Sequence, residues 1–458
     1  MPLDQNISEA DTSIEDLSLR ALVSIEVDQL FGTFSYRLNS KDAGSKLVIL
    51  YGDNGSGKST ILECIYHLLS PAPDEGHRFF ISNVPFKSFQ VTFNDGWGVE
   101  VQKRAGLTGS YDLICYEPGR ATFSLEFDAE RKQFKDEAVE AYTSYLRKLN
   151  LEIFFLRADR SFTSDSHAQA RRAERDYWKT YSAALLRKLE PGSAEADQEL
   201  NSLKNAINRA NEYLRRLASR AANAGGASAN SIYEDVLSKI VSSEEAAQKE
   251  LGSSRTGLEI RLQILAERSK HFSKFSLTAP LQAAAIIKTI RIASDQRFPL
   301  VASVLEPYLG SVEARLKELE PIQELVESLV EDVNSFFTNK QLRFRLSSGI
   351  QITSLDGAPL SPDLLSSGEK HLLLMFCRTV IAHGRRTLFI IDEPELSLNI
   401  KWQHRIVERL LHLIKSSPTQ FVFATHSIEL LSQHLDQVFR LPTTPSQPKL
   451  LFSRNANG

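Results

Sequence analysis

The chain has 458 residues and a formal net charge of −3, with 42% hydrophobic and 24% charged residues. This length leaves room for about three domains, and the composition is that of an ordinary globular protein. The charge gives no general attraction to nucleic acid, and no apolar stretch reaches the about 20 residues that cross a bilayer. The cysteines lie far apart in apolar segments, which excludes a disulfide framework and predicts buried thiols in a reducing, cytoplasmic compartment. They are Cys64, Cys115 and Cys377.

The N-terminal part of the chain is rich in strand signals. Residues 1–20 are polar and without period, so we expect a flexible tail there. Between Leu22 and Leu38, β-branched and aromatic residues predict two strands with a turn at Phe31 and Gly32. Residues 79–127 are rich in Phe, Val, Thr and Tyr with turn residues between them, which predicts a small antiparallel sheet.

The middle of the chain predicts helices. Apolar residues recur there at three- and four-residue spacing with charges between them. We expect a helical insertion over 161–340 with a short antiparallel coiled coil. Its prolines are expected to break helices or to lie in their first turns; these are Pro280, Pro299 and Pro321.

Charge is unevenly distributed in this helical part. Residues 306–332 are acidic, and a basic cluster lies at Arg171–Arg175. The plain interpretation of both is a solvated helical face. The alternative is a surface for nucleic acid or an acidic partner, which the sequence supports weakly.

Strand signals return in the C-terminal part, first from Leu342 and then at Leu388–Ile391 and Phe421–Phe423. A predicted helix over Lys401–Ile414 separates the last two strands, and this order indicates a parallel α/β sheet. We therefore expect one α/β head built from two parts of the chain, with a terminal tail. The ranges are 21–160 and 341–440 for the head and 441–458 for the tail.

A glycine-rich motif, GDNGSGKS at 52–59, lies between a predicted strand over Leu47–Tyr51 and a predicted helix over Ser59–Leu69. Glycines let backbone N–H groups turn toward a phosphate, and the helix adds its positive N-terminal end. Lys58 is expected to reach the β- and γ-phosphates, and Ser59 to bind Mg²⁺. The motif predicts ATP and Mg²⁺ as cofactors. The expected nucleotide contacts are Gly52, Asp53, Asn54, Gly55, Ser56, Gly57, Lys58, Ser59 and Thr60.

A second motif, TLFIIDE at Thr387–Glu393, reads as a buried strand that ends in two carboxylates. Ligands of open α/β sheets bind at this end of the strands. Asp392 is expected to hold Mg²⁺, directly or through water, and Glu393 to polarise the attacking water as general base. A strand that ends in a solvated acidic turn is the alternative, but the phosphate loop in the same chain favours catalysis.

Two further segments read LSSGE at 365–369 and FVFATH at 421–426. The order of phosphate loop, insertion, LSSGE, IIDE and ATH resembles the ABC-type ATPase class. The resemblance implies that a signature segment contacts the γ-phosphate of ATP held by a second protomer, and that His426 is the γ-phosphate switch. The matching signature residues are Ser366, Ser367, Gly368 and Glu369. Because Ser367 replaces the usual glycine and Glu369 the usual glutamine, we expect slow, regulatory turnover.

The segment EPELSLN at 393–399 resembles the corresponding turn of RecF, OLD and SMC-like ATPases. The segment upstream of the phosphate loop is similar to ATPase subunits of the PARIS and Septu antiphage systems. This resemblance implies a homodimer or higher oligomer, formed through an ATP sandwich, that controls a separate Toprim or HNH nuclease in response to a phage protein. Because few residues follow His426, we expect no Toprim domain in this chain. The alternative is a RecF/SMC-like ATPase of DNA repair or chromosome maintenance; no membrane partner is expected.

Two groups of side chains near these motifs have open roles. Phe31, Phe34 and Tyr36 lie upstream of the phosphate loop and either belong to the core or stack on adenine. The segment RADRS at 157–161 follows a predicted strand over 151–156. It either couples the nucleotide to the insertion or forms a surface turn.

Overall fold

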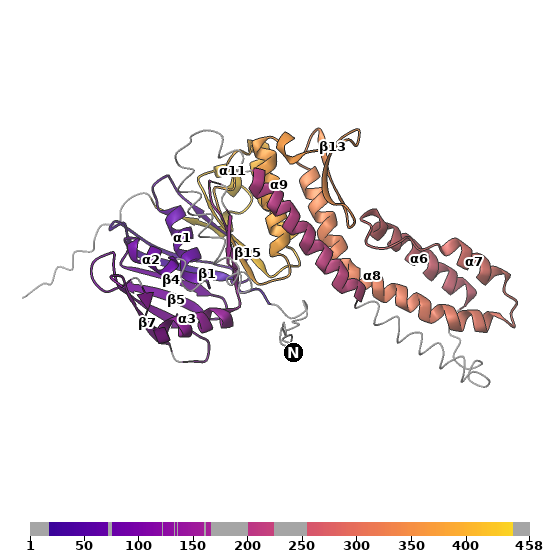
Figure 1. Cartoon of the computed structure of the whole chain (residues 1–458), viewed down its shortest axis with the longest axis horizontal. Helices are drawn as coiled ribbons and strands as arrows, with labels where there is room; N and C mark the ends of the chain where they lie inside the picture. The colour runs from indigo at the N-terminus through magenta and orange to yellow at the C-terminus, as the bar shows by residue number, and fades with distance from the viewer. Residues whose placement is uncertain are drawn as a thin grey trace, which may run out of the picture. The chain divides into compact units, whose positions relative to one another are not determined.

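The computed structural model describes residues 18–71, 76–120, 122–131, 133–134, 136–159, 162–165, 200–223 and 254–442. The chain divides into two compact units, one of Met1–Ser202 with Ala382–Gly458 and the other of Leu203–Ile381. Each unit is described by itself below (Figure 1). The domain limits at residues 20, 160, 340 and 440 remain a proposal, and the predicted tails lie largely outside the described residues.

The first unit contains a six-stranded sheet in the order β10-β9-β14-β15-β3-β16. Its strands are β3 (Leu47–Tyr51), β9 (Glu152–Leu156), β10 (Phe162–Asp165), β14 (Thr387–Asp392), β15 (Thr419–Thr425) and β16 (Val438–Arg440). β14 pairs in parallel with β9 and β15, and β3 pairs in parallel with β15 and β16. Every residue of β14 and β15 is buried, as continuous apolar runs predict for strands covered on both faces. The predicted parallel α/β sheet is confirmed.

Helices that pack near this sheet position the motifs. α1 (Lys58–Leu69) packs against β9, β14 and β15, and α10 (Ile400–Leu413) packs against the short α11 (Ile428–Leu431). Lys46, at the entry to β3, donates hydrogen bonds from Nζ to three carbonyls just after α10, at 2.7–2.8 Å. These oxygens belong to the unpaired C-terminal end of the helix, so the lysine charge is well placed there.

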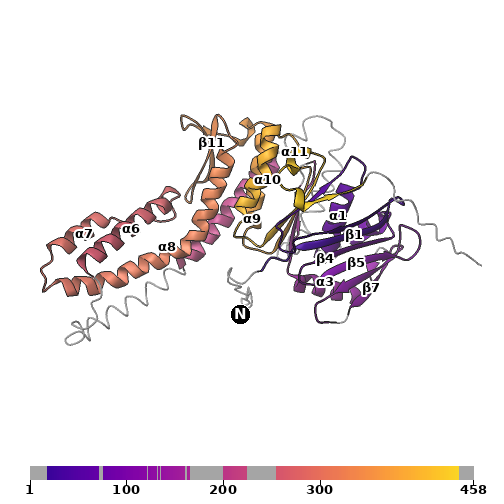
Figure 2. The same ribbon diagram turned by 180° about the vertical axis from the view of Figure 1, so that it is seen from behind.

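A seven-stranded antiparallel sheet in the order β2-β1-β4-β5-β6-β7-β8 completes the first unit (Figure 2). Its strands are β1 (Leu22–Leu30), β2 (Phe34–Asn39), β4 (Ser88–Phe93), β5 (Gly98–Lys103), β6 (Tyr111–Tyr116), β7 (Phe123–Asp128) and β8 (Gln133–Phe134). The predicted antiparallel sheet is confirmed, but its first residues form helix α2 (His77–Asn83) instead of a strand. Helix α3 (Asp136–Leu149) packs against β7 and β8.

The second unit is mainly helical. A helix covers residues 200–223, and the further elements are α6 (Arg255–Lys274), α7 (Ala283–Ile292), α8 (Phe298–Asn334), β11 (Lys340–Arg345), β12 (Gly349–Ser354), β13 (Pro359–Leu360) and α9 (Ser367–Ala382). Pro299 lies in the first turn of α8, as predicted. The expected break at Pro321 is wrong, because α8 continues through it and through Pro307. A buried stripe along the helix, with Leu316, Leu319 and Ile322 beside the proline, offsets the lost hydrogen bond through packing.

Ion pairs with α6 account for part of the acidic stretch at 306–332. Arg261 of α6 pairs with Glu313 of α8 at 2.6 Å, and Arg268 pairs with Glu320 at 2.5 Å. Because residue numbers rise together in both helices, α6 and α8 run parallel, whereas α6 and α7 form an antiparallel hairpin. Four acidic side chains of α8, those of Glu306, Glu313, Glu320 and Glu327, therefore pair with cations of α6, which argues against a surface kept for a partner. The basic cluster at 171–175 lies outside the described residues.

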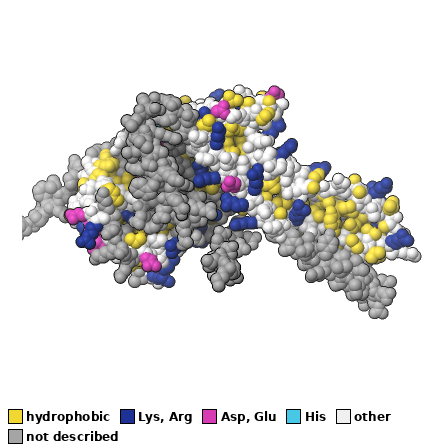
Figure 3. Space-filling model, in the orientation of Figure 1, with side chains coloured by type: hydrophobic (Ala, Val, Ile, Leu, Met, Phe, Trp, Pro, Cys, Tyr) yellow, Lys and Arg dark blue, Asp and Glu magenta, His cyan; other side chains and the backbone are white. Residues whose placement is uncertain are grey.

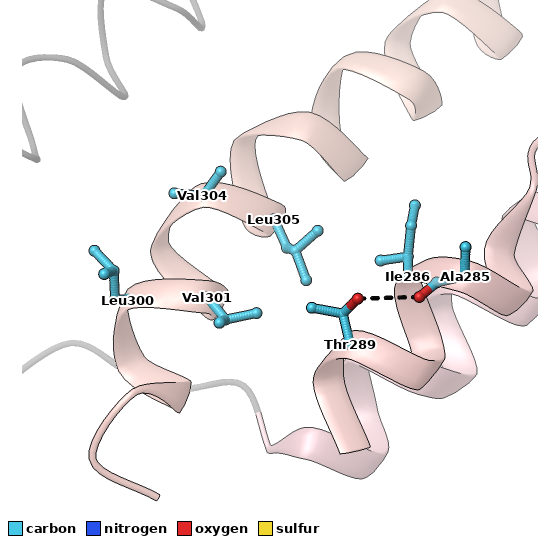
Figure 4. A pocket seen from close by; sticks show the side chains of 7 residues that line it. All are labelled: Ala285, Ile286, Thr289, Leu300, Val301, Val304 and Leu305. Carbon is cyan, nitrogen blue, oxygen red and sulfur yellow. Dashed lines mark hydrogen bonds between the residues drawn. The ribbon is translucent and has the colours of Figure 1, made fainter. Parts of the chain in front are cut away.

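Hydrophobic side chains gather over α6 and α7 on the face shown in Figure 3. A groove of about 460 Å³ lies between α7 and the start of α8 (Figure 4). Its one hydroxyl, on Thr289, donates to the Ala285 carbonyl within α7, so the lining offers no catalytic side chain. Among the helices that the structure describes, none combines the length and the apolar character needed to cross a membrane.

Candidate nucleotide-binding site

The phosphate-loop motif forms a tight loop between β3 and α1. Gly55 and Gly57 have φ angles of +85° and +86°, a region that L side chains rarely adopt. A Cβ atom on Gly57 would lie 2.6 Å from Cδ2 of Leu30, at the end of β1. The last glycine of the motif is therefore required both by backbone conformation and by the hairpin packed against the loop.

Lys58 turns back over the loop. Its Nζ donates to the carbonyl oxygens of Gly52 at 2.7 Å and Asp53 at 3.0 Å. Burial lowers the pKa of Lys58, and nearby carboxylates oppose this shift by favouring its charged form. Those carboxylates belong to Asp392, Glu393, Glu395 and Asp53.

The remaining loop residues differ in exposure. Asp53, Asn54, Gly55 and Ser59 are exposed, Gly52 and Ser56 are buried, and Thr60 is half-buried. The exposed backbone of this loop and the first turn of α1 are the part of the motif that a ligand reaches directly.

Ser59 and Asp392 come together although 333 positions separate them in the sequence. The Ser59 side chain hydrogen-bonds with the Asp392 carboxylate, and burial raises the pKa of Asp392 despite that bond and the Lys58 charge. Oδ1 of Asp392 is buried and has no hydrogen-bond partner among the described residues. Mg²⁺ prefers oxygen ligands and commonly takes one or two carboxylates with substrate phosphates. A hydroxyl beside an unpartnered carboxylate oxygen fits that ion.

The turn after β14 brings Glu393 close to His426. Glu393 has a φ of +51°, and its N–H donates to the Ala424 carbonyl at 2.9 Å. This conformation costs a non-glycine residue about 1–2 kcal/mol, and such strain concentrates at functional sites. Oε1 of Glu393 lies 3.6 Å from Nδ1 of His426, which follows β15.

A third carboxylate, on Glu395, contacts the His426 of this pair. Its Oε1 accepts hydrogen bonds from the Thr425 hydroxyl at 2.6 Å and the His426 N–H at 3.1 Å. The same oxygen lies 3.3 Å from His426 Nδ1. Sequence analysis gave Glu395 no role, although the second glutamate of EPELSLN was a signal that could have found it.

The signature segment belongs to the second unit, at the start of α9. Glu369 Oε2 accepts from the N–H of Ser366 at 2.7 Å and from its hydroxyl at 2.9 Å, and Ser366 Oγ accepts from the Glu369 N–H at 3.3 Å. This reciprocal arrangement is a capping box. Lys340 Nζ lies 3.1 Å from both Glu369 oxygens. Burial would raise the pKa of Glu369, but these contacts with Ser366 and Lys340 hold it below its usual value. Ser367 is exposed and Gly368 is buried in the first turn.

The aromatic residues upstream of the phosphate loop divide into two environments. Tyr36 is buried and donates its hydroxyl to the Ser56 carbonyl at 2.9 Å, so it supports the loop from within. Phe34 stacks against Tyr36. Phe31 is 43% exposed in the turn between β1 and β2. Of the three, Phe31 is the aromatic ring available to an outside group.

Arg157, after β9, lies with its Nε 3.8 Å from Glu63 Oε1 on α1. Its guanidinium also lies over the rings of Tyr66 and Phe155. Arg157 therefore joins the strand end to the helix that follows the phosphate loop. Arg160, in the same RADRS segment, lies outside the described residues.

The phosphate loop that precedes α1 and the carboxylates that end β14 are the features of a nucleotide-binding domain of the AAA type. Residues 47–432 match the family described as "AAA domain, putative AbiEii toxin, Type IV TA system". The match covers most of the sequence, and the chain belongs to this family. No curated protein matches the chain.

Among the solved structures that resemble the chain are SMC head domains. One is a Pyrococcus furiosus Smc head with an extended coiled coil bound to the C-terminal domain of ScpA, with 12% identity, coverage of 90% of this chain and 91% of that chain, and a TM-score of 0.37. A Pyrococcus yayanosii Smc head with a coiled coil and joint has 17% identity, coverage of 90% and 93%, and a TM-score of 0.34. The Thermotoga maritima SMC head has 12% identity, coverage of 90% and 90%, and a TM-score of 0.32.

Proposed function

We propose that this chain binds ATP with Mg²⁺ and hydrolyses it slowly, as a regulatory switch. The observation that carries the proposal is the convergence, within one unit, of a phosphate loop, a serine–aspartate pair and a glutamate–histidine pair. The first pair is Ser59 with Asp392, and the second is Glu393 with His426 at 3.6 Å.

Each residue has a defined task in this proposal. Lys58 exchanges its two carbonyl partners for oxygens of the β- and γ-phosphates, which accept stronger, charge-assisted hydrogen bonds. Ser59 and Asp392 hold Mg²⁺, which neutralises phosphate charge when bound. The other phosphate-loop residues contribute backbone N–H groups or line the nucleotide; they are Gly52, Asp53, Asn54, Gly55, Ser56, Gly57 and Thr60.

Glu393 acts as the general base. A carboxylate can accept a proton from water as the water attacks the γ-phosphate. His426 contacts the γ-phosphate and so distinguishes ATP from ADP. Its contact with Glu393 connects the sensing of the phosphate to the position of the base.

The signature segment is proposed to act on the ATP of a second protomer. The start of α9, a helix of 16 residues, can present backbone N–H groups and a positive helix end to a γ-phosphate. The capping box of Ser366 and Glu369 supports the proposal by fixing the first turn, in which Ser367 and Gly368 would face the phosphate. Two chains related by a twofold axis would then complete two sites.

We further propose that the chain is the sensor, scaffold and switch of a cytoplasmic antiphage complex. A separate Toprim or HNH nuclease would be its effector and a phage protein its trigger. The family description supports a defence role because it names a toxin of a toxin–antitoxin system. A RecF/SMC-like role in DNA repair or chromosome maintenance is the second candidate, favoured by the resemblance of EPELSLN to that class.

The central experiment replaces the base. Glu393→Gln keeps the shape of the side chain and removes its basicity, so hydrolysis should slow by about 100-fold while ATP still binds. Glu152→Gln is the matched control, because Glu152 begins β9 at the opposite end of the parallel sheet and pairs with Arg385. Turnover of Glu393→Gln at the wild-type rate would remove Glu393 from the mechanism.

The two biological roles are separated by purification and by DNA. A nuclease that co-purifies with the natively expressed chain and is released or activated upon hydrolysis supports the defence role. ATP hydrolysis that rises when duplex DNA is added, with no nuclease retained, supports the chromosome or repair role and contradicts the first.

A further inference from the structure

Glu395 is a buried carboxylate that the proposed hydrolysis mechanism does not use. It is 6% exposed and lies two residues after Glu393 in the turn that follows β14. One of its oxygens, Oε1, accepts hydrogen bonds from the Thr425 hydroxyl and the His426 N–H, and it also lies 3.3 Å from the ring atom Nδ1 of His426. The other, Oε2, is buried and has no hydrogen-bond partner among the described residues.

These contacts fix His426 at two points. The backbone N–H of His426 donates to Oε1 at 3.1 Å, and the ring atom Nδ1 lies 3.3 Å from the same oxygen. Nδ1 thus faces two carboxylate oxygens, Oε1 of Glu395 at 3.3 Å and Oε1 of Glu393 at 3.6 Å, and because carboxylate oxygens accept hydrogen bonds this environment favours a hydrogen on Nδ1. Nε2 is then the ring atom left to face a ligand. The ring is 49% exposed, so packing alone leaves it free to rotate.

Thr425 also contacts Glu395. Its hydroxyl donates to Oε1 at 2.6 Å, and Thr425 is itself fully buried as the last residue of β15. The buried strand β15 therefore fixes the Glu395 carboxylate, and the carboxylate contacts the exposed His426. Groups that contact a histidine without touching its ligand commonly set the ring orientation and tautomer of a functional histidine.

We propose that Glu395 is a positioning residue that orients His426 and fixes its Nδ1–H tautomer, so that Nε2 faces the γ-phosphate. This inference rests on the proposed function of His426. Glu395 itself touches neither nucleotide nor metal in this scheme. Its removal therefore affects hydrolysis and the γ-phosphate contact only through His426.

The test is a double-mutant cycle in the full-length chain, with turnover and ATP affinity measured separately. His426→Ala should lower kcat, and Glu395→Ala should lower it by about 10- to 100-fold, the scale of a misplaced catalytic group. Because Glu395 acts through His426, adding Glu395→Ala to His426→Ala should lower kcat by less than about twofold further. The Kd for ATP should likewise change by less than about twofold when Glu395→Ala is added to His426→Ala, because any effect of Glu395 on the nucleotide passes through His426.

Glu395→Gln repeats the cycle with a variant of the same shape, in case the alanine variant does not fold. Its neutral amide oxygen attracts the Thr425 hydroxyl and the two His426 nitrogens more weakly than a carboxylate does, so kcat should again fall. Glu429→Gln is the control, because Glu429 lies on α11 and contacts Ser427 instead of His426. It should keep the wild-type kcat.

The outcomes separate this inference from the function on which it rests. Multiplicative losses in the double variant, with His426→Ala slow by itself, would overturn the role of Glu395 and leave that of His426 standing. An unchanged kcat in Glu395→Gln would also overturn the role of Glu395. Wild-type turnover of His426→Ala would instead contradict the proposed function of His426.

Discussion

At the scale of single residues, Lys58 carries the largest expected effect on ATP binding. Its Nζ is the one charged donor of the loop motif, and it faces two loop carbonyls 2.7 and 3.0 Å away. Lys58→Ala should weaken ATP affinity by about 10- to 100-fold, because a hydrogen bond to a charged group contributes about 1.5–3 kcal/mol. Equilibrium binding of a fluorescent ATP analogue measures this change.

Lys46 provides the matched control for Lys58. Its Nζ also contacts backbone carbonyls, those after α10, but it lies at the opposite end of β3 from the phosphate loop. Lys46→Ala should lower the thermal unfolding temperature without changing ATP affinity. Equal loss of affinity in the two variants would show that Lys58→Ala acts through folding, contrary to the phosphate-loop assignment.

The burial of Lys103 predicts that its contribution to stability rises with pH. Lys103 is 3% exposed, its Nζ donates to the carbonyls of Ile81 and Ser82, and burial lowers its pKa from 10.5 to about 8. Between pH 8 and 10 the unfolded chain therefore binds more protons at this residue than the folded chain, so its contribution to stability rises with pH. Relative to Lys103→Met, the free energy of unfolding of the wild type should rise by about 2 kcal/mol across this window.

Urea unfolding at several pH values measures that difference. The comparison with Lys103→Met cancels the tyrosines, whose raised pKa values act in the opposite direction at higher pH. If the free energy of unfolding changes with pH in the same way for the two proteins, the lowered pKa of Lys103 is contradicted.

At the scale of elements, the start of α9 depends on Glu369. Glu369→Ala leaves the Ser366 N–H and the Lys340 ammonium without their carboxylate, which should cost about 1–2 kcal/mol of local stability. Glu369→Gln keeps the capping box and loses only the ion pair, so its cost should be smaller. Hydrogen exchange of the α9 amides measures both.

The pH dependence of this helix start follows from the lowered pKa of Glu369. A carboxylate with a pKa below its usual value of 4.5 contributes stability above that pH and loses it as pH falls through the folded pKa. The difference between wild type and Glu369→Ala should therefore be constant near pH 7 and shrink in acid. A difference that grows in acid would contradict the capping box.

At the scale of the whole molecule, the proposed ATP sandwich requires two chains for each active site. Gly368→Arg should leave ATP binding at Lys58 intact and abolish hydrolysis, because a bulky side chain enters the first turn of the signature helix. Mixed with Lys58→Ala protein, it should regain partial activity. In a mixed pair one site carries both defects and the other carries neither.

Assembly is measured alongside activity. Glu393→Gln with ATP should form a longer-lived dimer than the same protein with ADP, because only ATP supplies a γ-phosphate for the opposing helix. Sedimentation detects that difference. If mixed dimers form and each variant binds as expected but no activity returns, the sites are not shared between chains.

Sequence reasoning located the site motifs well where the chemistry is local. The strand over Leu47–Tyr51 and the helix that starts at Lys58 match the prediction to within a residue. Glycine conformation, lysine charge and helix polarity all act within a few positions of each other. Pro321 shows the limit of this reasoning, since its local signal for a helix break is overridden by burial along α8.

The sequence by itself determined the α/β class, the phosphate loop and the two carboxylates that end a central strand, because apolar runs and short motifs act over a few residues. Tertiary structure decided that Glu395 and Thr425, 30 positions apart, share a hydrogen bond. It also decided that Ser59 meets Asp392 and that the first hairpin packs on the loop at Gly57. These contacts depend on the pairing of β14 with β15 and of β15 with β3. Strand register is set by burial summed over the whole sheet, which no single segment encodes.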